Sequence, residues 1–521
     1  MHRALLISEV LSEIFAHLNE NRIAGKKPSS LEALARTCKA FHEPAMDLLW
    51  AVLDGVIPLL GCVARLHRLI YSSGSKVSPD LSCLFLFASS LNLQKRLTWD
   101  WSEGVDPLSA HEAHRFLEHA ARVRSLSISC SEDLHLFALL PIETCMFPRL
   151  LSLTFLVRRL QHKYLYLFLS PALRRCVLSV VTPELKSLAT RCAALEHLSV
   201  KTPEWGQQPV DDRILLSDTV RLCKRLVTLS CLPLDWAAWK HLSDLPSLLK
   251  VSVRELRSAF RWSLNRDIVN FTHFPNVTTL SFNVNTAAYA ITVMQHSEFP
   301  SLREFEVVTD VLPCVEAEQL FSALSQCKAE QTLGHIAITS LFPKVSKPSC
   351  DSLAAVTQLL CFTHLRTVRL NLHHCIDIDN DLLLKVVSSW PRIRSLELVD
   401  SKMLPAVTLR GLFAALRLCP YLHTLRTLVN AANIDFDPAA ESFQHTTLQT
   451  LDLIQSDVTD AEAVAHIIFS VLPCVDRIRT RKDPRHGTVY QTRWDEVNRH
   501  LKDLKSSEVV GGDITGTVTE S

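Results

Sequence analysis

The chain has 521 residues, too many for one ordinary globular core, so its length predicts either several domains or a repeating fold. Its 55 lysines and arginines are balanced by 54 aspartates and glutamates, which argues against a general attraction to nucleic acid or to an anionic membrane. The 12 glycines leave little material for glycine-rich phosphate-binding loops. An apolar content of 47% argues against general disorder.

The cysteines and the apolar stretches indicate where the protein works. The 16 cysteines are scattered singly, often at apolar positions such as Cys192 and Cys223, and no CxxC occurs. This placement favours reduced, mostly buried thiols in a cytoplasmic or nuclear protein. Glu9 and Glu13 interrupt the region where a secretory signal would be apolar. The longest apolar stretch, 48–64, contains an aspartate, a glycine and a proline, so no membrane span is expected.

Three short helices are predicted in the first sixty residues. Ser8 is placed to cap the first helix, Ser29 and Glu32 have the spacing of a capping box for the second, and the third begins at Pro44. The apolar positions are Val10, Leu11, Ile14, Phe15 and Leu18 in the first helix, Leu31, Leu34, Cys38 and Phe41 in the second, and Leu48, Leu49 and Val52 in the third. Three such helices form only a marginal core, so this unit is expected to lean on a neighbour or a partner.

One short phrase recurs along the rest of the chain. "FPRLLSLTF" at 147–155, "FPNVTTLSF" at 274–282 and "WPRIRSLEL" at 390–398 share the pattern LxxLxL. Its last two apolar positions alternate, as in a short strand with one buried face. Fourteen copies can be placed, and their first apolar positions are Val123, Leu150, Leu173, Leu195, Leu226, Leu248, Val277, Leu302, Leu333, Leu365, Ile393, Leu422, Leu448 and Val475. These positions span 352 residues in 13 intervals, a mean of about 27.

The segments between the strands have a different period. The stretches 318–327, 409–419 and 460–474 place apolar residues three and four apart, which is typical of amphipathic helices. Asp460 places negative charge at the start of the last of these helices. A single helix–turn–strand–loop unit cannot bury both its helix stripe and its strand face, whereas stacked units share a continuous core. The pattern therefore predicts an α/β solenoid with parallel strands on its concave side and helices on its convex side.

This array resembles the leucine-rich repeats, whose units have about 20–29 residues. The resemblance implies a right-handed solenoid from about 120 to 485. The family places Asn or Cys in the loop that follows each strand, where the side chain bonds to loop backbone. Asn285 and Asn430 fit that rule, but other copies do not, so the solenoid is expected to be irregular and most of its turns to be satisfied in another way. For the weakest copies, at Leu173 and Leu333, the alternative is a chance match in a leucine-rich chain.

The N-terminal helices resemble an F-box. The residues that match the family pattern are Leu6, Glu9, Ile14, Phe15, Leu18, Leu31, Cys38, Lys39, Phe41, Leu49 and Trp50. The usual proline is replaced by Ser8, which loses rigidity at the helix start but keeps a capping residue. With its repeats, the chain resembles the F-box proteins with a C-terminal leucine-rich-repeat-like domain that are abundant in mushroom-forming fungi. The alternative is that the three helices only cap the solenoid.

The resemblance implies the substrate-recognition subunit of a Skp–cullin–F-box ubiquitin ligase. The F-box would bind the Skp adaptor and through it the cullin, and the repeats would hold an unknown substrate protein. Such a chain contributes proximity and is not an enzyme. The expected adaptor-binding residues are Leu6, Val10, Ile14 and Leu18, and the expected F-box core is Phe15, Leu31, Cys38, Phe41 and Trp50. The second hypothesis, from another class, is a repeat scaffold that binds a partner protein without any ligase role.

No motif predicts a catalytic, cofactor or metal site. The stretch "HHCIDIDND" (373–381) begins like a calcium loop, but Leu382 and Ser388 occupy its sixth and twelfth positions instead of Gly and Glu. Zinc would need a fourth ligand at a known spacing, so a solvated turn that caps the following helix is the better interpretation. GxGxxG, GxxxxGK[ST], GxSxG and HExxH are all absent from the sequence, so no enzyme and no cofactor are expected.

The C-terminal part combines a basic run with a last helix. Arg477, Arg479 and Arg481 would share one face of a strand, either as a strip for phosphate or acidic substrate or as a charged edge that protects the last strand. An amphipathic helix at 492–504, which contains Trp494, is expected to cap the solenoid. The predicted divisions are 1–60 for the F-box-like helices, 61–120 for a helical linker and the start of the solenoid, 121–485 for the repeats, 486–504 for the capping helix and 505–521 for a flexible tail.

Overall fold

The fold is known from a computed structural model of the chain, which forms two compact units, Met1–Leu234 (unit 1) and Asp235–Ser521 (unit 2). The residues that the structure describes are 7–20, 30–71, 106–129, 134–140, 145–157, 159–201, 210–255, 272–342, 353–373, 375–376, 378–400, 405–436, 443–453, 456, 458–479 and 489–512. Leu6 lies outside them. No helix among these residues is both long enough and apolar enough to cross a lipid bilayer.

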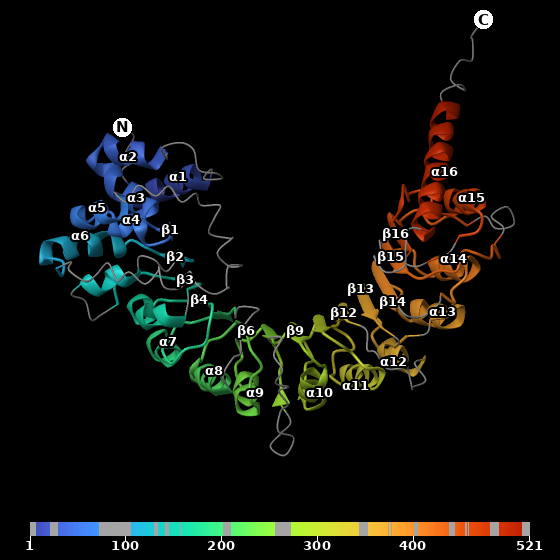
Figure 1. Cartoon of the computed structure of the whole chain (residues 1–521), viewed down its shortest axis with the longest axis horizontal. Coiled ribbons are helices and arrows are strands. Elements are labelled where there is room, and N and C mark those ends of the chain that lie inside the picture. Colours follow the sequence, from blue (N-terminus) through green and yellow to red (C-terminus); the bar gives the residue numbers. More distant parts are fainter. Residues whose placement is uncertain are drawn as a thin grey trace, which may run out of the picture. The chain divides into compact units, whose positions relative to one another are not determined.

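Unit 1 begins with short helices and continues as a parallel sheet (Figure 1). Its helices are α1 (Ser8–Glu20), α2 (Ser30–Thr37), α3 (Lys39–Leu49), α4 (Ile57–Leu60), α5 (Ala64–Tyr71), α6 (Ala110–Ala120), the 3-10 helices η4 (Leu134–Leu139) and η5 (Arg159–Phe168), α7 (Leu185–Arg191) and α8 (Val210–Leu222). Its strands are β1 (Val52–Asp54), β2 (Ser125–Ile128), β3 (Ser152–Phe155), β4 (Arg175–Leu178), β5 (His197–Val200) and β6 (Thr228–Cys231). These strands pair in chain order, each parallel to the next.

Unit 2 continues the same alternation of strand and helix. Its strands are β7 (Lys250–Arg254), β8 (Thr272–His273), β9 (Thr279–Val284), β10 (Ser297–Glu298), β11 (Glu304–Thr309), β12 (His335–Ser340), β13 (Thr367–Leu372), β14 (Ser395–Asp400), β15 (Thr424–Thr427), β16 (Thr450–Leu453) and β17 (Ile478–Arg479). Its helices are α9 (Trp236–Ser243), α10 (Ala288–Gln295), α11 (Cys314–Ser325), α12 (Leu353–Thr357), the 3-10 helix η7 (Gln358–Cys361), α13 (Asn380–Ser389), α14 (Leu409–Arg417), α15 (Ala461–Val471) and α16 (Val489–Gly512). Strands β8 and β10 pair separately, and the others form one parallel sheet in chain order.

The fourteen predicted repeats form the parallel strands β2–β7, β9 and β11–β17. All fourteen first apolar positions are at most 2% exposed, and a strand begins two residues after each of them, or three after Val475. The weakest copies, at Leu173 and Leu333, form β4 and β12. In unit 2, helices α10, α11, α13 and α14 lie along one face of the sheet, and the strands lie on the other side of this layer (Figure 1). The prediction of an α/β solenoid with parallel strands is therefore confirmed.

Stacked repeats place equivalent apolar residues side by side. Leu370 lies in register with Leu398, and Phe274 stacks on Phe299 with ring centroids 4.8 Å apart. Both of these phenylalanines precede the proline of the repeated phrase, and both are buried. The phrase recurs because each unit contributes one such layer to the shared core, and a unit without neighbours would leave its layer in water.

The turns after the strands are held by polar side chains of adjacent repeats, as the scarcity of the family asparagine predicted. Oδ2 of Asp400, a buried residue, accepts hydrogen bonds from the backbone N–H groups of Cys375 and Ile376 at 2.7 and 2.9 Å. Ser340 accepts from the N–H of Leu312 at 3.1 Å in the same way. These contacts link consecutive repeats because buried backbone N–H groups need an acceptor.

Asp400→Ala is expected to lower the free energy of unfolding by about 2–4 kcal/mol, because it leaves two buried N–H groups without their acceptor. Urea unfolding of the intact chain measures this loss. Asp400→Asn is the matched control, since it keeps one acceptor oxygen and is expected to cost less. Equal costs for the two variants would contradict the assigned role of the carboxylate.

The N-terminal helices differ from the prediction in their boundaries. Cys38 is extended and ends the second helix, so α3 begins at Lys39 and Pro44 lies inside it instead of at its start. After α3, the chain does not continue as a helix but enters β1, which pairs with β2. Leu53 is buried there and Val52 is exposed, which is the alternation of a strand. Pairing with the first repeat overrides the local helix preference.

The last helix is longer than predicted. Helix α16 continues past residue 504 to Gly512, because the sequence between these positions contains no glycine or proline before Gly511. The part of the expected flexible tail up to 512 is therefore helical, and residues 513–521 lie outside the described part of the chain.

Candidate functional site

The first helix packs one apolar face into a small core. Leu11 and Phe15 are each 2% exposed, and they cluster with Leu31 and Ala45 from the next two helices. Phe41 is half-buried and meets Phe15 edge-to-face, with ring centroids 5.5 Å apart. The helices α1–α3 thus bury a core of their own, which contains the predicted core residues Phe15, Leu31 and Phe41.

The same helix keeps a second apolar face exposed. Val10 and Ile14, four residues apart on one side of α1, are 36 and 41% exposed, and Ile7, directly before the helix, is 50% exposed. Of the predicted adaptor-binding residues, Val10 and Ile14 therefore lie on this face. Leu6 and the side chain of Leu18 lie outside the described part of the structure. The name "α1 face" is used below for Ile7, Val10 and Ile14.

Two predicted core residues lie elsewhere. Cys38 is half-buried between α2 and α3 and does not belong to the core cluster. Trp50 follows the end of α3 and stacks on the ring of His119 at the end of α6, with centroids 4.5 Å apart. Burial lowers the pKa of His119, which favours the neutral form of the imidazole that stacks on Trp50. Trp50 thus fastens the helices to the first repeat and is not among the residues of the cluster around Phe15 and Leu31.

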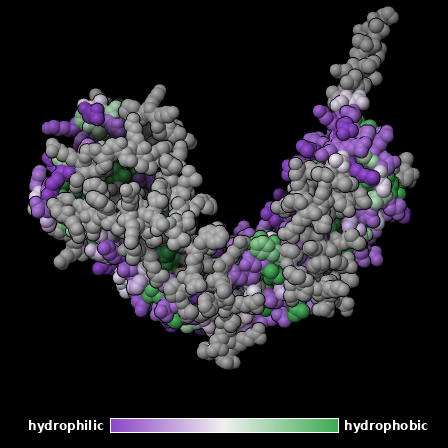
Figure 2. Space-filling view, viewed as in Figure 1, coloured by the Kyte–Doolittle hydropathy of each residue, from purple (hydrophilic) through white to green (hydrophobic). Residues whose placement is uncertain are grey.

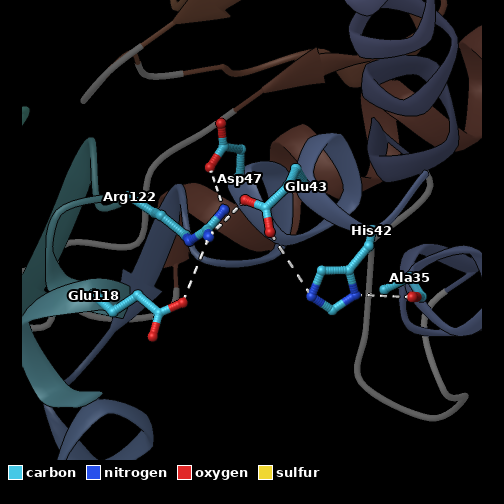
Figure 3. Close-up of polar contacts among 6 residues, drawn as sticks. All are labelled: Ala35, His42, Glu43, Asp47, Glu118 and Arg122. Atoms are coloured by element: carbon cyan, nitrogen blue, oxygen red, sulfur yellow. Dashed lines mark hydrogen bonds and ion pairs between the residues drawn. The ribbon is translucent and has the colours of Figure 1, made fainter. Parts of the chain in front are cut away.

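Arg122, in the turn before β2, forms the second attachment (Figure 3). Its guanidinium donates to Asp47 Oδ1 at 2.7 Å and to Glu43 Oε2 at 2.8 Å, both on α3, and lies 3.9 Å from Glu118. Burial alone would lower the pKa of Arg122, but the hydrogen bonds to Glu43 and Asp47 raise it. In turn, the hydrogen bond from Arg122 holds the pKa of Glu43 below its ordinary value. Arg122 was not recognised in the sequence, because its partners lie more than seventy residues away.

Arg122→Met is expected to lower the free energy of opening of α3 away from the first repeat by about 1–2 kcal/mol. The substitution keeps the apolar stem but removes the charged donors. Hydrogen exchange of the α3 amides measures this change. Arg124→Met, on an exposed neighbour, is the matched control and is expected to change nothing.

Since the pKa of Glu43 is lowered by folding, the contact between Glu43 and Arg122 is fully present above the ordinary pKa of 4.5 and weakens as the pH falls through the pKa of the folded state. Unchanged α3 exchange in Arg122→Met would refute this attachment.

The strands of unit 2 present a second candidate surface on the side opposite the helices. Five charged residues of alternating sign lie side by side in register on β13–β17: Arg369, Glu397, Arg426, Asp452 and Arg479. Arg426 Nη1 lies 2.6 Å from Glu397 Oε1, and its Nε lies 3.2 Å from Asp452 Oδ2. The described surface of unit 2 seen in Figure 2 is mostly hydrophilic. This charged row makes the strand side of β13–β17 polar rather than apolar.

The predicted basic run lies only partly in the described structure. Arg477 and Arg479 line a hollow of about 560 Å³ together with Gln449, Asp476 and Asp495, and Arg481 lies outside the described residues. The hollow carries charges of both signs, so the structure does not select between the two interpretations of this run.

The stretch 373–381 forms a helix cap. Asp379 accepts a hydrogen bond from the N–H of Leu382 at 2.8 Å and begins α13. Cys375 and Ile376 are buried, so this part of the turn is not solvated as predicted. His374 and Asp377 lie outside the described residues. Within the described part of the chain, no group of three or more His, Cys, Asp or Glu residues is placed to hold a metal ion.

Known proteins resemble the chain only at the level of solved structures. No protein-family model matches the chain. No curated protein matches it either. The Toll–Spatzle complex of Drosophila matches with a TM-score of 0.35 and 14% identity over 72% of this chain and 50% of that chain. The LRIM1/APL1C complex matches with a TM-score of 0.33 and 12% identity, over 77% of this chain and 70% of that chain. The APL1 leucine-rich repeat domain matches with a TM-score of 0.32 and 16% identity, over 73% of this chain and 85% of that chain. The match thus spans half the length of the chain compared in the Toll–Spatzle complex. The repeat class of this chain follows from its own strands and spacing.

Proposed function

We propose that the chain is the substrate-recognition subunit of a Skp–cullin–F-box ubiquitin ligase. In this proposal α1–α3 bind the Skp adaptor, and through it the cullin, while the repeats bind a substrate protein. The chain itself catalyses nothing, because its contribution is to hold the substrate near the transferring enzyme. The proposal places the chain in the cytoplasm or nucleus. The free cysteines of the described residues fit a reducing compartment.

One observation carries the proposal: α1 buries Leu11 and Phe15 in a core of the three helices and still exposes the α1 face. A helix that only capped the solenoid would direct its apolar residues toward the repeats. Here the attachment to the repeats is made by Arg122 and Trp50 at α3 instead. Exposed apolar residues grouped on one helix are typical of a surface that a partner covers.

A pull-down of the intact chain with a purified Skp adaptor tests the proposal. We expect a stable complex that places the α1 face in the interface. The second candidate function, a repeat scaffold without a ligase role, rests on the charged row of unit 2, which needs no adaptor. Absence of adaptor binding by the intact, folded chain would reject the ligase and favour the scaffold.

A further inference from the structure

We propose that the strand side of unit 2 binds an acidic segment of a partner protein at an arginine cluster formed by Arg366, Arg369 and Arg394. All three side chains are exposed: Arg369 lies on β13, and Arg366 and Arg394 immediately precede the adjacent strands β13 and β14. The backbone N–H of Arg394 donates to the carbonyl of Arg366 at 2.8 Å, so these two arginines are immediate neighbours. The proposal concerns the repeats alone and holds whether or not α1–α3 bind an adaptor.

The cluster differs from the paired charges beside it. Arg426 has Glu397 and Asp452 as ion-pair partners. Arg369 lies in register with Glu397, but Glu397 pairs with Arg426, and within the described residues the guanidinium groups of Arg366, Arg369 and Arg394 form no ion pair or hydrogen bond. Like charges on adjacent strands repel, so this arrangement weakens the sheet slightly. An anionic ligand would relieve the repulsion and accept from donors that have no acceptor among the described residues.

Two hydroxyl groups lie within the cluster. Thr367 and Ser395 are partners in register on β13 and β14, and both are half-buried. Adjacent strands are about 4.8 Å apart, so one carboxylate can reach both hydroxyls and the guanidinium groups around them. Hydroxyl and guanidinium donors together match the acceptor geometry of a carboxylate.

The surroundings of the cluster favour a patterned peptide over a continuous polyanion. Glu304 and Glu306 on β11 line a hollow of about 230 Å³ with His335 of β12. Burial, with the nearby Arg369, lowers the pKa of His335 although Glu304 and Glu306 act in the opposite direction, which disfavours a positive charge on the ring that would offset these carboxylates. A nucleic-acid backbone that crossed the sheet from β13 to β11 would meet this negative site. A protein segment can instead place a lysine or arginine there.

The distance between the two sites defines the segment. Strand β11 lies two strands from β13, and two strand spacings amount to about 10 Å. An extended peptide covers this distance in about three residues. The expected ligand therefore carries adjacent Asp or Glu residues and a basic residue about three positions away.

The test is fluorescence anisotropy of the intact chain with a labelled peptide that has two glutamates, two alanines and a lysine, in this order. We expect binding that weakens as salt is added, because the charges are exposed. Arg366→Gln and Arg394→Gln are each expected to weaken binding about tenfold. Arg410→Gln is the matched control, because Arg410 is also exposed but lies on α14. It is expected to leave binding unchanged.

Three results would overturn the proposal: no binding of the peptide at low salt, equal losses in Arg394→Gln and Arg410→Gln, or equally tight competition by a single-stranded oligonucleotide. The adaptor pull-down is repeated with the same variants to separate this proposal from the ligase role. Peptide binding without any adaptor binding rejects the ligase and leaves the acidic-segment site intact. Adaptor binding without peptide binding rejects the acidic-segment site and leaves the ligase proposal intact.

Discussion

Ile14→Asp is expected to abolish adaptor binding by the intact chain and to leave its melting temperature almost unchanged. Ile14 is 41% exposed in the free protein, so an aspartate there remains solvated and costs little folding stability. In a complex that covers the α1 face, the same carboxylate would be desolvated without a partner. That penalty amounts to several kcal/mol, enough to lower the affinity more than a hundredfold.

Ile57→Asp is the matched control for this experiment. Ile57 is 39% exposed and belongs to the same unit, but it lies on α4 and not on the α1 face. The pull-down should retain Ile57→Asp and lose Ile14→Asp, while thermal unfolding should be similar for both. If Ile14→Asp instead makes the chain insoluble and the unmodified chain never binds the adaptor, the three helices serve only as a cap and the ligase proposal is wrong.

The repeats could be predicted from sequence because their signal is both local and repeated. Each LxxLxL copy buries its own first position, and the spacing between copies confirms the assignment even where one copy is weak, as at Leu173. The boundaries of α3 could not be predicted in the same way. Pro44 is compatible with the start of a helix, and only the extended backbone at Cys38 and the pairing of β1 with β2 show where the helix begins and ends.

The charged row of unit 2 was missed although the sequence contains a signal for it. Arg369, Glu397, Arg426, Asp452 and Arg479 each occupy the fifth position of their LxxLxL copy. Alignment of the copies by their first apolar residue places the five charges in one column, and parallel pairing in register turns this column into a row of neighbours. The attachment by Arg122 has no comparable signal, because its partners belong to no repeat.

Trp494→Ala is expected to destabilise the C-terminal end of unit 2 by about 3–5 kcal/mol, because it removes a large side chain that is only 1% exposed. Its Nε1–H donates to the backbone carbonyl of Ser456 at 2.8 Å, so the substitution also removes this buried hydrogen bond. Val497 and Leu501 are buried on the same side of α16, which covers the last repeat. Loss of the tryptophan should therefore loosen the whole helix.

The end of the sheet should open in this variant, because α16 also closes the edge of β17. The side-chain amide of Asn498 accepts from the N–H of Ile478 at 2.8 Å and donates to its carbonyl at 3.0 Å, as a further strand would. Repeats depend mainly on their nearest neighbours, so hydrogen exchange should increase in β16, β17 and α15 and stay unchanged in unit 1. Trp494→Phe is the control, since it keeps a ring and should cost less. Protection that falls evenly along the chain would show that the repeats unfold as one block and that α16 is no local cap.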